Sequence, residues 1–227
     1  MKLMISGFEQ PVEINEGYAL SLEVEDRRLF TRICQSLHSE LGEAALEPYV
    51  VFDDEGGKVR PAKAFLSVFN PFDLPWNERA LMGKVVERIE GMLLADDELR
   101  RDIEERGIAL STAVEEMGFQ LQSDYAFKVD WEIAEYLKSF DFEVEVDEAN
   151  SLLENLIKFL KLAEDASFEK VICFLNLKSF LEENELEEFF TQVFLSKSKI
   201  LLLEGIHDGR IFEYERKMHI DEVFLQE

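Results

Sequence analysis

Cysteine is nearly absent from this chain, which has only Cys34 and Cys173 among its 227 residues. Two cysteines are too few for a disulfide framework or a cysteine-based metal site, so we expect two buried thiols in a reducing compartment. Long apolar runs are also missing, since none approaches the roughly 18 residues that a membrane-spanning helix needs. The first residues turn polar too early for the apolar region of a signal peptide. We therefore expect a cytoplasmic protein that does not enter a membrane.

Basic residues are scarce as well. The chain carries 24 lysines and arginines against 49 aspartates and glutamates, which gives a formal net charge of −25. Phosphate binding needs a basic surface, so this balance lowers the expectation of nucleic-acid binding. Net charge is not local field, however, because a basic stripe inside a concave surface can focus positive potential while the exterior stays acidic. The positions of the few bases therefore matter more than their number.

Several catalytic motifs are missing. The chain has no G-x-x-x-x-G-K-[ST] loop and no G-x-G-x-x-G turn, and Gly56-Gly57-Lys58 fits a hairpin turn between two strands. It has no H-E-x-x-H and no G-x-S-x-G either, and His38, His207 and His219 stand isolated in the sequence. These absences argue against nucleotide hydrolysis, zinc chemistry and a serine hydrolase.

The clearest pattern that is present is a strand, a helix and a second strand. Val171–Leu175 and 200–204 are short apolar runs, typical of strands buried on both faces of a sheet. Between them, Ser179-x-x-Glu182 has the spacing of a capping box and predicts the start of the intervening helix. Such a unit indicates a parallel sheet, in which ligands commonly bind at the loop after the strand. Here that loop, 176–178, has no glycine and no obvious catalytic acid.

Other strands are expected near both ends of the chain. Residues 18–24 and 142–146 alternate between apolar and polar, the period of a half-buried strand. In the tail, 211–214 and 220–225 are candidate edge strands. A helix should begin at about Glu25, directly after the first of these strands.

The pattern of apolar residues changes at residues 70–75, which are rich in proline and other helix breakers. From there to residue 140 the apolar residues recur with helical spacing throughout. The sequence therefore predicts an α/β domain made of 1–75 and 141–227, with a mixed, largely parallel sheet. An all-helical domain is inserted in it at 76–140.

An acid-x-lysine pattern, Glu215-Arg216-Lys217, is the best local candidate for metal-dependent nuclease chemistry. A two-metal site needs carboxylates that converge from different elements. No matching aspartate stands on a neighbouring predicted strand, and acidic pairs arise by chance in so acidic a chain. The nuclease is kept as an alternative.

Basic residues recur at helical spacing in two places. Arg28 and Arg32 lie four residues apart on the first helix, and Lys158 and Lys161 lie three apart on a helix predicted at 150–163. Such residues are commonly solvated or form salt bridges within the helix. Spacing alone does not separate these roles from binding of a phosphate backbone.

The order of the elements resembles that of a known family, the type II-A CRISPR-associated accessory proteins (the Csn-two, or Csn2, family). The opening FEQPVEINEGYALSLEVEDRRLFTRICQSL has the family's strand, turn, second strand and first helix. The resemblance covers nearly the whole chain and rests on the order of elements, with no short catalytic signature. It continues in AFLSVFNPFDLPW, the two long helices, WEIAEYLKSFDFEVEV, KVICFLNLKSFLEENELEEFF and KILLLEG.

The resemblance implies a fold and a function. The family has an α/β head, similar in shape to P-loop ATPases but without the phosphate loop, and an inserted helical leg. Four copies form a ring whose lysine-lined hole threads onto ends of double-stranded DNA. The family has no known catalytic activity and acts in acquisition of new spacers, beside the integrase pair and the effector nuclease.

For this chain the resemblance predicts a non-catalytic homotetramer that binds no nucleotide. Binding to DNA would be independent of sequence and strongly dependent on salt. The residues predicted to line the hole and contact DNA are Arg27, Arg28, Arg32, Lys158 and Lys161.

One departure concerns calcium, which stiffens the ring in many members. They carry a dense acidic run between the second long helix and the next, whereas 120–130 of this chain keeps only Asp124 and Asp130 as carboxylates. These two are the predicted metal ligands, but calcium prefers six to eight oxygen ligands. Three ways of holding the ring together are therefore left: calcium at this position, calcium at another position, or packing between the copies alone.

Two alternatives of other classes remain at this stage. One is a metal-dependent nuclease on the same scaffold, with Glu215 and Lys217 in its site. The other is an acidic scaffold that binds only proteins and has no affinity for DNA.

Overall fold

A computed structural model describes residues 1–123, 125–126, 131–139, 142–147 and 149–221. The chain forms two compact units. One combines Met1–Trp76 with Val146–Glu227, and the other is Asn77–Glu145. The fold is of the α/β class with a parallel sheet, as the sequence predicts.

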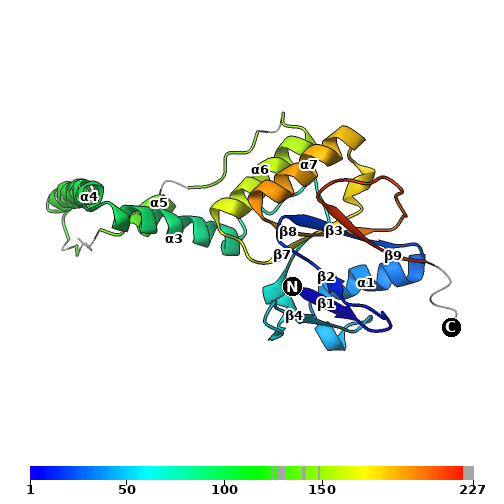
Figure 1. The fold of residues 1–227 in the computed structure, drawn as a ribbon. Coiled ribbons are helices and arrows are strands. Elements are labelled where there is room, and N and C mark those ends of the chain that lie inside the picture. The colour runs from blue at the N-terminus through cyan, green and yellow to red at the C-terminus, as the bar shows by residue number, and fades with distance from the viewer. Residues whose placement is uncertain (124, 127–130, 140–141, 148, 222–227) are drawn as a thin grey trace. The chain divides into compact units, whose positions relative to one another are not determined.

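The first unit is built on a five-stranded parallel sheet (Figure 1). In spatial order its strands are β6 (Phe65–Val68), β7 (Val171–Leu175), β8 (Lys199–Glu204), β3 (Tyr18–Val24) and β9 (Glu215–Ile220). The apolar runs of β7 and β8 pair in register, with Cys173 opposite Leu201, and are buried almost throughout. Because both faces of such strands are covered, their sequence reads as a continuous apolar run and not as an alternation.

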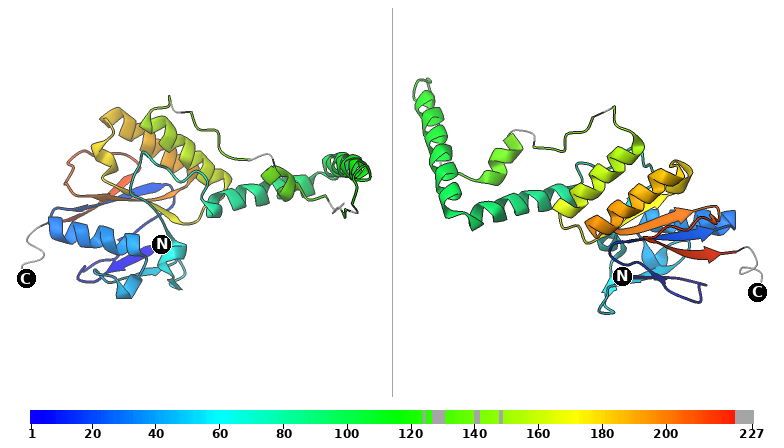
Figure 2. Two further views of the ribbon diagram at one scale, coloured as in Figure 1. Left: turned by 180° about the vertical axis from the view of Figure 1, so that it is seen from behind. Right: turned by 45° about the horizontal axis from the view of Figure 1, so that its top comes forward.

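Helices cover both faces of this sheet. The helix α1 (Arg27–Ser39) lies on one side, and α6 (Leu152–Asp165) and α7 (Glu183–Ser196) lie on the other (Figures 1 and 2). On the α1 side, Leu22 of β3 belongs to the same buried cluster as Ile33 of α1. The β7–β8–β3 centre of the sheet is thus enclosed between two helical layers.

A second, antiparallel sheet of four strands completes this unit. Its order is β2 (Val12–Glu13), β1 (Lys2–Ile5), β4 (Tyr49–Phe52) and β5 (Lys58–Val59). The inward residues of β1 and β4 share the buried cluster of α1. Between β4 and β5, the Asp53 carboxylate accepts hydrogen bonds from the backbone N–H groups of Glu55 (3.0 Å) and Gly57 (2.6 Å), and Gly56 has φ +86°. The predicted hairpin turn at Gly56-Gly57-Lys58 is therefore confirmed.

Short elements link the main ones. These are the 3-10 helices η1 (Gly42–Ala44) and η2 (Leu177–Ser179) and the one-turn helix α2 (Pro61–Ala64). Cys34 is half-buried, Cys173 is buried, and both thiols are free.

Three local predictions are wrong. The helix α7 begins at Glu183, with a capping box formed by Glu182 and Glu185, while Ser179 belongs to η2. Ser179-x-x-Glu182 and Glu182-x-x-Glu185 have the same spacing, and the second, which directly precedes the apolar face of the helix, caps α7. Residues 142–147 form no strand, since their alternation finds no partner strand in the described part of the chain.

The third wrong prediction is the edge strand at 211–214. The strand in the tail is β9, at Glu215–Ile220. An edge strand is only partly buried, so its sequence, ERKMHI, lacks a clear apolar pattern. Pairing with β3 decides its position. Of the predicted strand at 220–225, residues 222–225 lie outside the described residues.

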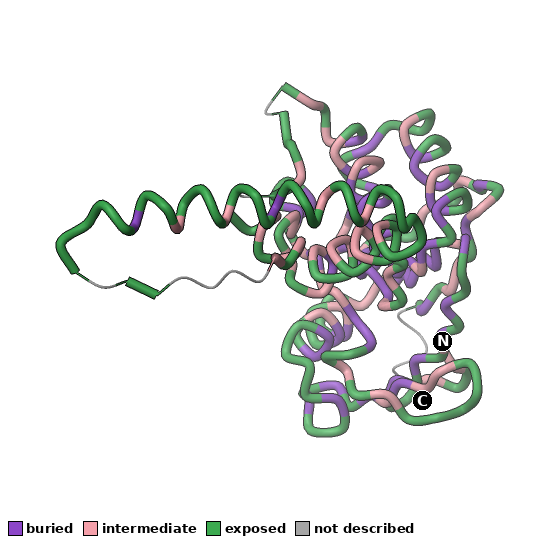
Figure 3. The backbone as a smooth tube through the Cα atoms, turned by 90° about the vertical axis from the view of Figure 1, so that its left-hand side faces the viewer, coloured by how far each residue is buried: buried purple, intermediate pink, exposed green. Residues whose placement is uncertain are grey.

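The second unit consists of α3 (Arg79–Ala95), α4 (Asp97–Gly118) and α5 (Ile133–Ser139). Asp96 caps α4 by accepting hydrogen bonds from the N–H groups of Glu98 (3.1 Å) and Leu99 (2.9 Å). Most of this unit is exposed (Figure 3), and the only fully buried residues of α4 are two glycines. No helix of the described chain combines the length and the apolar character needed to cross a membrane.

Candidate functional site at the carboxyl edge of the parallel sheet

Parallel strands bring polar side chains together on the α7 side of the sheet. Glu23 near the end of β3 lies opposite Glu204, the last residue of β8. Glu215 and Lys217 of β9 point to the same face, because Lys217 lies opposite Ser21 of β3. In α/β proteins, ligands bind near the carboxyl ends of such strands.

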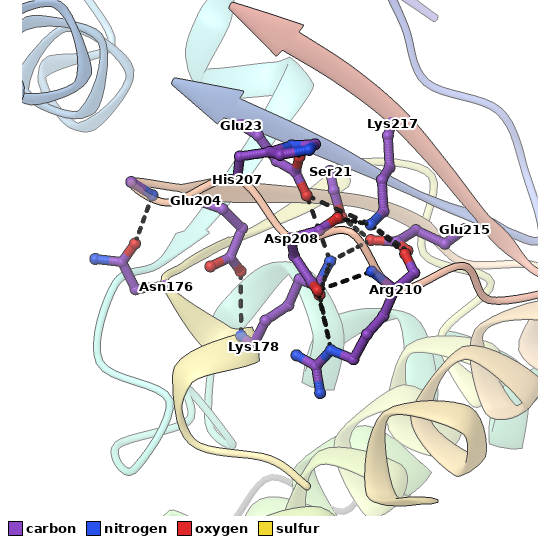
Figure 4. A network of polar contacts seen from close by, with 11 residues as sticks. Ser21, Glu23, Asn176, Lys178, Glu204, His207, Asp208, Arg210, Glu215 and Lys217 are labelled. Atoms are coloured by element: carbon purple, nitrogen blue, oxygen red, sulfur yellow. Dashed lines mark hydrogen bonds and ion pairs between the residues drawn. The ribbon is translucent and has the colours of Figure 1, made fainter. Parts of the chain in front are cut away.

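Lys178 is at the centre of these side chains (Figure 4). Its Nζ lies 2.7 Å from Asp208 Oδ2, 2.8 Å from Glu215 Oε1 and 3.5 Å from Glu23 Oε1. Burial by itself would lower the pKa of Lys178, but its hydrogen bonds to Asp208 and Glu215 raise the pKa above its ordinary value. The side chain is therefore a buried ammonium that its own chain neutralises.

The segment 205–214, which connects β8 to β9, is held against the sheet by these charges. Lys217 donates hydrogen bonds to the carbonyl oxygens of Asp208 and Arg210, and Arg210 Nε lies 3.0 Å from Asp208 Oδ1. At the start of the segment, the N–H of Gly205 donates to Asn176 Oδ1 at 2.9 Å. We name the side chains of Glu23, Lys178, Glu204, Asp208, Arg210, Glu215 and Lys217 the edge network.

Two carboxylates of the edge network titrate far from their ordinary range, in opposite directions. Burial raises the pKa of Glu204 to about 7, and the hydrogen bond from the backbone N–H of Lys178 opposes this only in part. For Asp208, burial also favours the neutral form, but hydrogen bonds from Arg210 and Lys178 outweigh it and hold the pKa well below its usual range. The edge network therefore contains one carboxylate that stays ionised and one that gains a proton near neutrality.

Two histidines lie at the exposed rim of the edge network. The rings of His207 and His219 are 4.3 Å apart, and His207 Nδ1 is 2.7 Å from Glu23 Oε2. His219 Nε2 lies 3.5 Å from Glu25 Oε1. Within the residues that the structure describes, no three histidine, cysteine or carboxylate side chains are grouped so that they could hold a metal ion.

The positions that a phosphate ligand would use are filled by the chain itself. The N-terminus of α1, next to the end of β3, is capped by Asp26, whose Oδ1 accepts from the N–H of Leu29 at 2.6 Å. The N-terminus of α7 is capped in the same way by Glu182. In proteins that bind phosphate at such an edge, helix N-termini and a lysine contact the phosphate. Here carboxylates of the chain itself occupy the places that a phosphate would take. The edge network holds 205–214 on the sheet through ion pairs and hydrogen bonds of the chain itself.

The residues predicted to bind DNA lie elsewhere and in two places. Arg27, Arg28 and Arg32 are exposed on α1, where Arg32 Nη2 is 2.7 Å from Glu47 Oε2. Lys158 is half-buried and Lys161 exposed on α6. Since α1 and α6 cover opposite faces of the sheet, a single chain does not join the two sets into one patch. The predicted metal ligands Asp124 and Asp130 lie outside the described residues.

Sequence reasoning missed most of the edge network. It selected Glu215 and Lys217 and looked for a matching aspartate on a neighbouring strand, whereas the acid beside them is Glu23 of β3. One signal was available: Glu23 and Glu204 are charged residues inside otherwise apolar strands, and such residues are seldom buried without a partner. Nothing local indicates that Lys178 is that partner.

The fold and the edge network define a class: an α/β protein with a parallel sheet, in which the chain's own charged side chains fill the edge where such folds commonly bind ligands. Residues 45–222 match the model of the family "CRISPR-associated protein (Cas_Csn2)", and the chain belongs to this family. The family predicted from the sequence is thereby confirmed, and with it a CRISPR-associated role. The helix α1 precedes the matched residues.

Individual relatives agree with this assignment. The chain is similar to the CRISPR-associated protein Csn2 of Enterococcus faecalis, with 22% identity over 234 residues that cover 94% of each chain. Its fold is similar to the crystal structure of Stu0660 of Streptococcus thermophilus, with a TM-score of 0.54 and 12% identity. That match covers 96% of this chain and 74% of the other.

Proposed function

We propose that this protein is a non-catalytic, ring-forming member of the Csn2 family that binds double-stranded DNA ends without sequence specificity. It supports acquisition of new spacers in CRISPR immunity, together with the integrase pair and the effector nuclease. Its α/β unit is the head, with the shape of a P-loop ATPase that lacks the phosphate loop, and Asn77–Glu145 is the helical leg inserted in it.

The observation that carries the DNA-binding proposal is the state of Arg27 and Arg28. Both are exposed in the first turn of α1, and within the described residues neither forms an ion pair. Acids outnumber bases about twofold in this chain, and several exposed bases are paired with acids: Lys2 with Glu13, and Arg32 of the same helix with Glu47. Unpaired guanidinium groups are suited to contact phosphate oxygens, which position DNA without reading its sequence.

The exposed apolar residues of α3 and α4 support assembly with further copies of the chain. A helix with so many exposed apolar residues is not stable alone in water, because most helical stability comes from packing of an apolar face. The large apolar side chains exposed on these helices are Met92, Leu94, Leu99, Ile108, Leu110, Val114 and Met117. In a homotetrameric ring, contacts between copies would cover them.

The absence of catalysis is supported by the edge network. Glu215 and Lys217, the pair that suggested a nuclease, belong to it, and the Glu215 side chain is only 1% exposed. Its Oε1 already binds Lys178, so a metal ion would have to displace a buried ammonium. Within the described residues, no group of three histidine, cysteine or carboxylate side chains is placed to hold a metal ion.

A mobility-shift assay with linear and circular duplex DNA of the same sequence tests the proposal. We expect binding to linear DNA only, because a closed ring must load from an end. The affinity should fall steeply with salt. In a plot of log K against log salt concentration, each phosphate contact contributes about −0.9 to the slope, so removal of one contact makes the slope shallower by that amount. Adding calcium or EDTA shows whether the assembly depends on the ion.

The decisive variant is Arg27→Gln/Arg28→Gln, which should weaken binding and lower the salt slope. Its control is Arg60→Gln/Lys63→Gln, which removes the same charge from exposed, unpaired bases at α2. Equal loss in both variants would contradict a specific role of α1. If the protein does not bind DNA at low salt, the alternative of a scaffold that binds only proteins is favoured. If the DNA fragments become shorter, the metal-dependent nuclease is favoured. In cells, the α1 variant should fail to acquire new spacers.

A further inference from the structure

A cavity of about 490 Å³ lies beside the antiparallel sheet, entirely within the α/β unit. It is lined by residues 41–44 at η1, by 49–51 of β4, and by 58–61 at β5 and the start of α2. Its volume falls in the range of about 300–1,000 Å³ that is usual for small-molecule sites. Neither the fold nor the DNA-binding proposal requires an opening at this place.

Two contacts join η1 to the β5 and α2 side of the cavity. Glu43 of η1 forms an ion pair with Lys58 of β5. Gly42 packs against Pro61, since an added Cβ atom would lie 3.2 Å from Pro61 Cγ. With φ +61°, Gly42 also has a backbone conformation that favours glycine, so the backbone itself sets this close approach. The cavity therefore has a defined shape in the folded chain.

The apolar part of the lining is accessible to a ligand. Its exposed or half-buried aliphatic residues are Leu41, Ala44, Val50, Val59 and Pro61. Leu41 is 61% exposed, whereas the aromatic residue of the lining, Tyr49, is only 2% exposed. A ligand that covers the aliphatic residues removes apolar surface from water, which contributes about 25 cal/mol for each Å² buried. The cavity therefore suits a branched alkyl group better than a flat ring.

The lining carries one positive charge in excess. Its charged residues are Glu43, Lys58 and Arg60, and the first two neutralise each other in their ion pair. Arg60 is exposed and forms no ion pair within the described residues. An unpaired guanidinium beside an aliphatic cavity suits an anion, although the chain as a whole has a net charge of −25.

We propose that this cavity binds a branched aliphatic carboxylate, either a free small molecule or the C-terminal residue of a partner protein. The alkyl group covers Leu41 and Val59, and the carboxylate pairs with Arg60, whose planar guanidinium matches two carboxylate oxygens. One unpaired guanidinium balances a carboxylate, whereas a phosphate monoester carries about two negative charges. Duplex DNA is disfavoured, because it offers no branched alkyl group. This inference does not rest on DNA binding by α1.

Methyl NMR of the full chain, in its own oligomeric state, tests the proposal with N-acetyl-leucine as the probe. The readout is the chemical shift of the Leu41 and Val59 methyl groups. The methyl groups of Leu46, which is exposed but outside the cavity, are the reference. We expect saturable shifts with N-acetyl-leucine and weaker binding of N-acetylleucinamide, which lacks the charge, and of acetate, which lacks the alkyl group. Duplex DNA should leave the cavity signals unchanged.

Two variants make the test specific. Arg60→Gln removes the unpaired cation from the lining and should weaken N-acetyl-leucine about threefold, as expected for one exposed ion pair. Its affinity for N-acetylleucinamide should stay unchanged, so that the preference for the acid over the amide disappears. Lys63→Gln removes the same charge from an exposed residue of α2 outside the cavity and should leave both affinities unchanged.

A tripeptide with a capped N-terminus and leucine at its free C-terminus distinguishes the two sources of the ligand. Tighter binding than that of N-acetyl-leucine identifies a protein chain end, and weaker binding identifies a free small molecule. The absence of shifts with N-acetyl-leucine would overturn the proposal. So would equal affinities for the acid and the amide, equal loss in both variants, or shifts of Leu41 and Val59 caused by duplex DNA.

Discussion

Lys178 and Glu215 form an ion pair of 2.8 Å between Nζ and Oε1, although 37 positions separate them in the sequence. Their side chains are 4% and 1% exposed. A buried pair of this kind adds little net stability compared with apolar residues, but removal of one partner leaves an uncompensated charge. The edge network is therefore most sensitive to loss of its central cation.

Lys178→Met should destabilise the α/β unit by about 3–5 kcal/mol, the usual cost of breaking a buried ion pair. The substitution leaves Asp208 and Glu215 without their shared ammonium, and segment 205–214 should open first. Urea denaturation measures the loss, and hydrogen exchange locates it. Lys63→Met, at an exposed lysine without an ion pair, is the control. A loss below about 1 kcal/mol for Lys178→Met would mean that the edge network is not structural.

Glu204→Gln should change how stability depends on pH. The pKa of Glu204 is about 7 in the folded protein and 4.5 ordinarily, so between these values the folded state holds more protons than the unfolded state. The free energy of unfolding should therefore fall as pH rises through this window, by about 3 kcal/mol at most from this residue. Glutamine does not titrate and still accepts the hydrogen bond from Lys178.

Chemical denaturation at pH 5 and pH 8 checks this prediction. The variant should gain stability relative to the unsubstituted protein at pH 8 and show a smaller difference at pH 5. Glu188→Gln, at an exposed position, should show no such pH-dependent gain. If Glu204→Gln were equally stabilising at both values, Glu204 would not be the group that titrates.

Gly107→Ala should displace Trp131 in the helical unit. A Cβ atom at Gly107 would lie 2.1 Å from the Trp131 ring, so the ring must move. Stability is a poor readout, because alanine favours the helix by up to about 1 kcal/mol and offsets the lost contact. A red shift of Trp131 fluorescence, in a Trp76→Phe background, reports the movement. Gly91→Ala in α3 is the control, since nothing lies within 4 Å of its added Cβ, and an identical spectrum in both variants would refute the contact.

If copies of the chain form the proposed ring through α4, Leu110→Gln/Val114→Gln/Met117→Gln should dissociate it. These residues are exposed in the single chain, so each substitution should change its stability by only about 0.5 kcal/mol. Contacts between copies, in contrast, would lose their apolar surface. Sedimentation velocity measures the oligomer, with Glu105→Gln/Glu116→Gln on α4 as the control. A triple variant with unchanged mass would show that α4 does not join the copies.

Elements whose signals are local can be predicted from the sequence alone. The apolar runs of β7 and β8 predict buried strands, and the helix predicted at 150–163 appears as α6 at Leu152–Asp165. The turn between β4 and β5 also follows from its own residues. In each case the backbone conformation depends on side chains a few positions apart, which a pattern can capture.

Which charged residues meet depends on how the strands pair in the folded chain. Glu23 and Glu215 come from β3 and β9, which are paired in space and lie at opposite ends of the sequence. Their common partner Lys178 sits in a loop whose sequence gives no sign of a buried ammonium. The cost of burying a charge depends on the distance to its counter-charges, and that distance is a property of the folded sheet. For the same reason β9, polar and at an edge, is a strand because β3 pairs with it.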